Sequence, residues 1–198
     1  MKKKENHEIE SSSPLERLGE AYIILLRGIN VSGKNKIPML DLRTLLNDLE
    51  FQNVQTYIQS GNIILESTSS KKEICQKIKK GIKEKFGFEI PVIVRTISEW
   101  QKTIENYPFP LNNEKIVAFT FLDRASEIKE IEIKNIGEDQ YKINGDVVYL
   151  NCPSTFAKTK ISNNVLEKKL QVIATTRNLR TTLKLLELSN SSLSKGKE

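Results

Sequence analysis

Residues 22–26 read Tyr-Ile-Ile-Leu-Leu, and this apolar run decides how the first half of the chain folds. Such an uninterrupted run is typical of a central strand that is buried on both faces. A polar loop follows at residues 27–36. Residues 38–49 then combine a proline suited to a first helical turn with leucines at helical spacing. The run therefore predicts a buried strand followed by a helix that packs on it.

The chain beyond this unit continues to alternate strands and helices. Residues 54–58 and 63–66 predict a hairpin around the polar turn 59–62. Ser70-Lys71-Lys72-Glu73 has the pattern of a capping box that opens a helix, Gly87 is a suitable stop for it, and residues 90–95 predict another strand. The order β-α-β-β-α-β over residues 21–96 is that of a ferredoxin-like lobe.

A weaker copy of the same order follows in residues 97–189. Its expected elements are a connecting helix at 98–106, a strand at 116–122, a short helix at 125–133, strands at 141–143 and 147–150 around Asn144-Gly145, and basic helices at 163–170 and 179–188. The sequence therefore predicts an α+β protein of two ferredoxin-like (β-α-β-β-α-β type) lobes packed together. A disordered tail is expected at residues 1–20 and a polar tail at 190–198.

The charge of the chain is concentrated near its C-terminal end. The 198 residues carry a formal net charge of +6, with a pI of about 9.2. Between Lys158 and Lys184 seven basic residues face one acid, Glu167, so this stretch holds the whole excess. A basic region inside a folded domain suggests an anionic partner, and the net charge favours nucleic acid as its class.

Other features of the composition exclude several kinds of function. No apolar run approaches the roughly 20 residues that a membrane span needs, and the N-terminus has no apolar signal core, so we expect a cytoplasmic protein without a membrane partner. His7, the only histidine, lies in the expected tail, and Cys75 and Cys152 are too few for a zinc site. We therefore expect no metal and no cofactor, and the lack of a catalytic histidine or paired acidic motif argues against an enzyme.

Residues 28–34 contain the pattern G-x-x-x-x-G-K directly after the first strand. This pattern resembles a phosphate-binding P-loop. However, Asn35 stands where a serine or threonine should bind magnesium, and the helix is expected only near Pro38. A simpler anion-binding loop, in which Arg27, Lys34 and Lys36 face the ligand, fits the pattern better.

A second candidate site lies at the start of the last helix. Asn178 is placed as an N-cap, and Arg177, Arg180, Thr181 and Lys184 then follow spacing that puts them on one helical face. Cations at a helix N-terminus oppose the helix dipole, which suggests that a ligand supplies the missing negative charge. The polar turn at residues 59–62 has two explanations, ordinary turn chemistry or hydrogen bonding to that ligand.

Three motifs resemble those of one mainly bacterial family. They are residues 26–31 with 33–39, residues 56–62, and residues 174–178 with Thr181 and Lys184. Together they resemble the family known only as domain of unknown function 1697, over about residues 22–188. The resemblance implies a cytosolic α+β protein of two related ferredoxin-like lobes, and it implies no reaction. The chain departs from the family at Leu179, where a tryptophan is usual, and at Gln171, where a glycine often stands.

The resemblance also selects a set of candidate ligand-binding residues. They are Arg27, Asn30, Lys34, Lys36, Gln59, Ser60, Asn62, Lys160, Thr176, Arg177, Asn178 and Thr181. We expect the loop at 27–36, the turn at 59–62 and the helix start at 176–184 to converge on an anionic, phosphate-containing ligand. The alternatives are an enzyme that acts on a phosphorylated small molecule with Lys34 or Lys160 as acid or base, and motifs that only lock the two lobes together.

Overall fold

The computed structural model describes residues 19–31, 33–111 and 113–195, with the side chains up to residue 191. The expected N-terminal tail lies outside the described residues except for Gly19 and Glu20, and Glu20 already belongs to the first strand. At the other end the expected polar tail is helical as far as Lys195.

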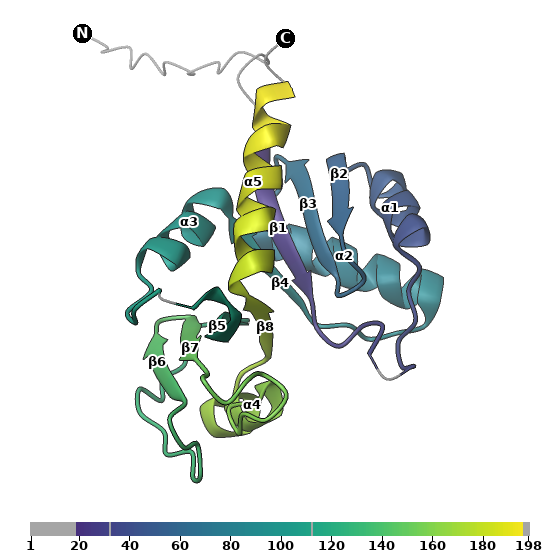
Figure 1. The fold of residues 1–198 in the computed structure, drawn as a ribbon. Helices are drawn as coiled ribbons and strands as arrows, with labels where there is room; N and C mark the ends of the chain where they lie inside the picture. The colour runs from purple at the N-terminus through teal and green to yellow at the C-terminus, as the bar shows by residue number, and fades with distance from the viewer. Residues whose placement is uncertain (1–18, 32, 112, 196–198) are drawn as a thin grey trace, which may run out of the picture.

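The first lobe has the β-α-β-β-α-β order that its sequence predicts. Its elements are β1 (Glu20–Leu26), α1 (Met39–Asp48), β2 (Gln52–Tyr57), β3 (Asn62–Ser67), α2 (Lys71–Phe86) and β4 (Val92–Thr96). The strands form one antiparallel sheet in the order β2-β3-β1-β4 (Figure 1). Both predicted signals around α2 are confirmed, because Ser70 forms the capping box with Glu73 and Gly87 ends the helix at φ 76°.

The apolar run at residues 22–26 is the centre of this lobe. Tyr22, Ile24 and Leu26 of β1 face a core that α1 and α2 cover, whereas Ile23 and Leu25 face the opposite side of the sheet. All five side chains are buried. The prediction of a strand buried on both faces is therefore confirmed, and the second buried face requires a further layer of the protein.

That layer consists of α3 (Ile97–Glu105) and α5 (Leu179–Lys195), and α5 stands beside β1 and α3 in Figure 1. Trp100 of α3 is fully buried and stacks on Phe121 of the second lobe with 4.3 Å between ring centroids. Its indole N–H donates to the carbonyl oxygen of Thr182 in α5 at 3.0 Å. The two lobes thus share a core, and the sequence boundary at residue 97 is no boundary in space.

The second lobe has the same strand order as the first. It consists of the short 3-10 helix η1 (Glu114–Ile116) and of β5 (Val117–Leu122), β6 (Gln140–Asn144), β7 (Val147–Asn151), α4 (Asn163–Leu170) and β8 (Ala174–Asn178). The sheet is antiparallel in the order β6-β7-β5-β8, which corresponds to β2-β3-β1-β4. The fold is therefore α+β with two ferredoxin-like lobes packed together.

The sequence prediction for this lobe differs from the structure in two places. The helix expected at 125–133 does not form, because Ser126 Oγ accepts from the Ile128 N–H and donates to the Leu170 carbonyl, which holds this segment in an irregular path. The outline also lacked a last strand: residues 174–178 form the edge strand β8, and the expected helix follows directly from Leu179 as α5. Pairing with β5, more than 50 residues earlier in the chain, decides this conformation.

The two lobes also match in strand register. Ile23 of β1 lies opposite Arg95 of β4, and Phe119 of β5 lies opposite Arg177 of β8. In each lobe the arginine is followed by the last residue of the strand, and a helix then begins. Arg95 and Arg177 therefore occupy equivalent positions in two structural repeats.

The backbone hydrogen bonds at the ends of the strands repeat as well. Arg27, directly after β1, donates its N–H to the carbonyl of Pro91, directly before β4, at 3.0 Å. Asp123, directly after β5, donates to the carbonyl of Ile173, directly before β8, at the same distance. The equivalence thus extends to the residues that flank the paired strands.

Candidate functional site

Arg177, the residue most strongly implicated by the sequence, is a buried strand residue. The prediction that it shares a helical face with Arg180, Thr181 and Lys184 is wrong, because it lies in β8 before the helix begins. Only 7% of the residue is exposed. Its guanidinium N–H groups donate to Asn62 Oδ1, Thr175 Oγ1 and the carbonyl oxygens of Thr176, Ser60 and Leu26. These five bonds equal its donor capacity, so no N–H group is left for a ligand in this arrangement.

Three of these acceptors belong to the first lobe, so Arg177 joins the two lobes. All five partners are neutral oxygens. Burial, and secondarily the charge of Arg27, lowers the pKa of Arg177 to about 10. That value is still well above neutral pH, so the buried side chain remains a cation that is stabilised by hydrogen bonds alone.

Arg95 makes the reciprocal connection from the first lobe to the second. Its guanidinium donates to the carbonyl of Leu122 at 2.6 Å and pairs with the Asp146 carboxylate at 2.8 Å. Leu122 ends β5 as Leu26 ends β1, and Asp146 lies in the β6–β7 turn as Ser60 lies in the β2–β3 turn. Burial lowers the pKa of Arg95 as well. We call Arg95 and Arg177, with these partners, the arginine clasp.

Arg95 lies outside the motifs that predicted the candidate site. A usable signal was present, because Arg95-Thr96 precedes one helix and Arg177-Asn178 precedes another. Thr96 and Asn178 both cap the helix that follows, through hydrogen bonds from the backbone N–H groups of Glu99 and Thr181. The predicted N-cap role of Asn178 is thereby confirmed.

Arg27 is a third cation between the lobes. Its Nε donates to Glu167 Oε1 of α4 at 3.0 Å, and its Nη2 donates to Asn164 Oδ1 at 2.9 Å. Glu167 also accepts the backbone N–H of Ala174 at the start of β8. The charge of Arg27 is therefore balanced by an acid of the second lobe.

The remaining candidate residues near the C-terminal end lie apart from one another. Thr176 Oγ1 donates to Asn163 Oδ1 at 2.7 Å and lies 2.7 Å from Thr120 Oγ1. Thr181 is buried in α5, while Lys160 is exposed in the loop before α4. These residues do not form a single cluster around one ligand position.

A second group of candidate residues does come together, in the first lobe. A cavity of about 600 Å³ lies between the loop that follows β1, the start of α1 and the β2–β3 turn. It is lined by Asn30, Gly33, Lys36, Ile37, Pro38, Met39, Leu40 and Gln59. We call it the α1 cavity. Three predicted site residues, Asn30, Lys36 and Gln59, contribute to its wall, and Lys34 lies on the same loop.

Asn30 holds the loop of the α1 cavity in shape. Its side-chain amide donates to the carbonyls of Ile37 and Gln59 at 3.0 Å each, and its Oδ1 accepts the N–H of Ile37 at 2.8 Å. The loop turns back tightly, with Val31 and Lys34 paired in a β-bridge. Since α1 begins only at Met39, no helix N-terminus follows the glycine-lysine pair, and the P-loop interpretation does not hold.

The backbone N–H groups at the start of α1 have no side-chain cap. Its N-cap is Pro38, which makes no side-chain capping hydrogen bond. The first N–H groups of a helix have no partner inside the helix, and Met39 and Leu40, the first two residues of α1, line the α1 cavity. Lys36 and Gln59 are exposed at the same cavity, and no side-chain bond to a described residue is seen for either.

Other kinds of site find little support among the described residues. Within the described ranges no three His, Cys, Asp or Glu side chains gather where they could hold a metal ion. No helix in the described part of the chain is long and apolar enough to cross a membrane. Cys152 is fully buried, and burial raises the pKa of its thiol to about 11.

The fold and the clasp together define a protein of two ferredoxin-like repeats that share a core and are joined by reciprocal arginines. The chain belongs to the family described as protein of unknown function (DUF1697), whose sequence profile matches residues 20–149.

A solved structure that matches is that of the conserved bacterial protein SP0830 from Streptococcus pneumoniae. The TM-score is 0.66 at 24% sequence identity, over 85% of this chain and 98% of that one. At this identity the likeness shows the fold alone. A search of the curated proteins finds no match.

Proposed function

We propose that this protein binds a compact phosphate- or carboxylate-bearing ligand in the α1 cavity. The observation that carries the proposal is the start of α1, where the helix has no side-chain cap and its first residues, Met39 and Leu40, line one cavity together with Lys36. A volume of about 600 Å³ lies within the range of small-molecule sites.

Each group around the α1 cavity has a distinct task in this proposal. The N–H groups of Met39 and Leu40 and the dipole of α1 attract the anion, and Lys36 adds a charge-assisted hydrogen bond. Gln59, exposed on the β2–β3 turn, orients the ligand through its side-chain amide. Asn30 fixes the loop without touching the anion, because its side chain is already engaged.

The proposal assigns no ligand contact to Arg177. Its hydrogen bonds within the protein support the alternative that the C-terminal motif holds the lobes together. In this proposal the anion-binding site and the lobe contact are separate features. The resemblance to the family had placed the residues of both in one set.

Thermal-shift measurements on the full chain test the proposal, with nucleotides, sugar phosphates and short RNA and DNA oligomers as the ligands. A small phosphate that raises the melting temperature of the wild type should bind Lys36→Gln roughly tenfold more weakly, since one charge-assisted hydrogen bond is lost. The matched control is Lys158→Gln, which removes an exposed lysine from a loop of the second lobe and should leave the shift unchanged.

A second variant tests the sign of the electrostatics. Asp41, in the first turn of α1, is exposed and would repel an anion at the helix start. Asp41→Asn should therefore tighten binding where Lys36→Gln weakens it. Ligand binding that neither variant changes would contradict the proposal. Stabilisation by oligomers alone that fades steeply with salt would favour nucleic acid as the partner instead.

A further inference from the structure

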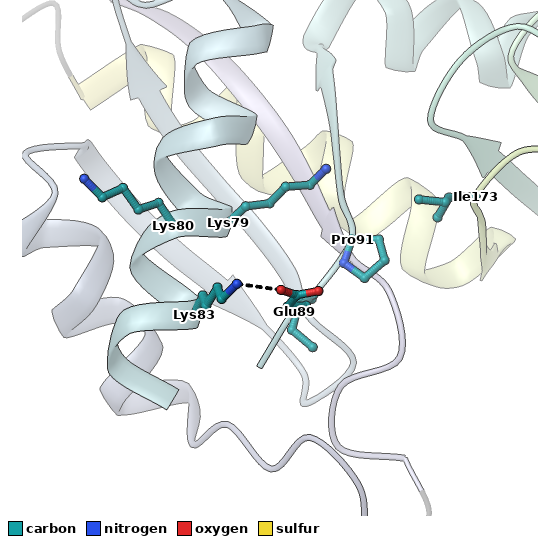
Figure 2. Close-up of a pocket in the computed structure, with 7 residues that line it drawn as sticks. Lys79, Lys80, Lys83, Glu89, Pro91 and Ile173 are labelled. Carbon is teal, nitrogen blue, oxygen red and sulfur yellow. Dashed lines mark hydrogen bonds and ion pairs between the residues drawn. The ribbon is translucent and has the colours of Figure 1, made fainter. Parts of the chain in front are cut away.

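A second cavity is lined by residues of α2, of the segment before β4 and of the residue before β8. Its volume is about 490 Å³, and Figure 2 shows the residues that line it: Lys79, Lys80, Lys83, Glu89, Ile90, Pro91 and Ile173. We call it the junction cavity, because Ile173 belongs to the second lobe and the other residues to the first. Contacts between lobes are a preferred place for small-molecule sites.

The apolar wall of the junction cavity is formed by Ile90, Pro91 and Ile173. Ile90 is only 3% exposed and belongs to the core of the first lobe, whereas Pro91 and Ile173 are half-buried. Pro91 and Ile173 occupy equivalent positions in the two repeats, each directly before the last strand of its lobe. A molecule in this cavity would therefore touch both lobes at corresponding points.

The polar wall carries an excess of positive charge. Lys83 Nζ pairs with Glu89 Oε1 at 2.6 Å, and this hydrogen bond lowers the pKa of Glu89. Lys80 lies 3.8 Å from the exposed carboxylate of Glu84, and in Figure 2 it points away from Ile173.

Lys79 differs from the other two lysines. Its side chain extends from α2 toward the side of Pro91 and Ile173 in Figure 2, and among the described residues it has no acidic partner within ion-pair distance. Three lysines and one glutamate line the cavity, so its lining has an excess of two positive charges. Unlike Lys80, Lys79 extends toward the side on which Pro91 and Ile173 lie (Figure 2).

We infer that the junction cavity binds an amphiphilic anion, a molecule with a compact apolar body and one carboxylate, phosphate or sulfonate group. The apolar body lies against Ile90, Pro91 and Ile173, and the anionic group pairs with Lys79. An inorganic anion lacks the apolar body and gains nothing from this wall, whereas an uncharged apolar molecule leaves Lys79 unpaired. This site shares no residue with the α1 cavity.

A fluorescence titration of the full chain with 1-anilinonaphthalene-8-sulfonate tests the inference, because this probe is an aromatic sulfonate. Wild type should bind the probe, Lys79→Gln should weaken binding about tenfold, and Ile173→Ser should weaken it further. The matched control is Lys72→Gln, which removes an exposed lysine of the same helix that does not line the cavity and should bind as wild type does. Circular dichroism melts of each variant check that the probe reports on folded protein.

Competition then tests the chemical class of the ligand. Naphthyl phosphate should displace the probe, whereas inorganic phosphate at the same concentration should not. The inference is overturned if wild type does not bind the probe, if Lys79→Gln and Lys72→Gln bind it equally, or if inorganic phosphate competes as well as naphthyl phosphate. It is also overturned if Lys36→Gln weakens probe binding, because the probe would then occupy the α1 cavity. Binding of the probe in the junction cavity does not test the proposal for the α1 cavity. Failure of the probe to bind there does not test it either.

Discussion

The arginine clasp makes a quantitative prediction about stability. Arg177→Ala removes the donors from five oxygen atoms, three of which lie across the lobe contact, on Asn62, Ser60 and Leu26. Leaving a buried acceptor unsatisfied costs about 1–3 kcal/mol, although water that enters the vacated space will satisfy part of this set. Removing a buried cation also relieves its desolvation penalty. We therefore expect a net loss of about 3 kcal/mol in the free energy of unfolding.

Equilibrium unfolding in urea, followed by circular dichroism, measures this loss. The control is Arg180→Ala, because Arg180 is the exposed arginine three residues further on and should change stability by less than about 0.5 kcal/mol. Arg177→Lys should also be destabilised, since an ammonium group keeps the charge but offers three donors without the planar fork. The reasoning is refuted if Arg177→Ala loses no more than Arg180→Ala does, or if Arg177→Lys is as stable as wild type.

Two further predictions concern a glycine and a buried thiol. Gly61 has φ 76°, and an added Cβ would lie 2.7 Å from Leu26 Cβ. Gly61→Ala should therefore cost about 3 kcal/mol in urea unfolding, against about 1 kcal/mol for Gly145→Ala, whose added Cβ meets no atom within 4 Å. Similar losses at both glycines would contradict the steric argument. The thiol of Cys152 is buried with a pKa of about 11, so iodoacetamide at pH 8 should modify Cys75 first and reach Cys152 only after unfolding, as mass spectrometry of the peptides would show. Equal labelling of both cysteines in the folded protein would disprove the burial of Cys152.

Elements that depend on neighbouring residues could be predicted from the chain alone. The apolar run at 22–26, the capping box at Ser70, the stop at Gly87 and the N-cap at Asn178 all act within a few residues of the chain. Helix caps and hydrophobic periodicity are local, so they can be recognised without knowing the fold. They were sufficient to predict two ferredoxin-like lobes and the element order of the first, whereas in the second lobe the helix expected at 125–133 is absent and the strand β8 was not predicted.

The direction in which Arg177 points, and the groups that it contacts, depend on long-range strand pairing. Its neighbours in sequence suggested the exposed face of a helix, but β8 pairs with β5 and turns the guanidinium into the first lobe, against groups more than 100 residues away in the chain. The candidate site was divided for the same reason, with Lys36 and Gln59 at a cavity and Arg177 in the lobe contact. Long-range strand pairing and lobe packing depend on surfaces that exist only after each lobe has folded. No periodicity of the chain encodes them, and so a polar motif alone does not distinguish a residue that waits for a ligand from one that already has its partners.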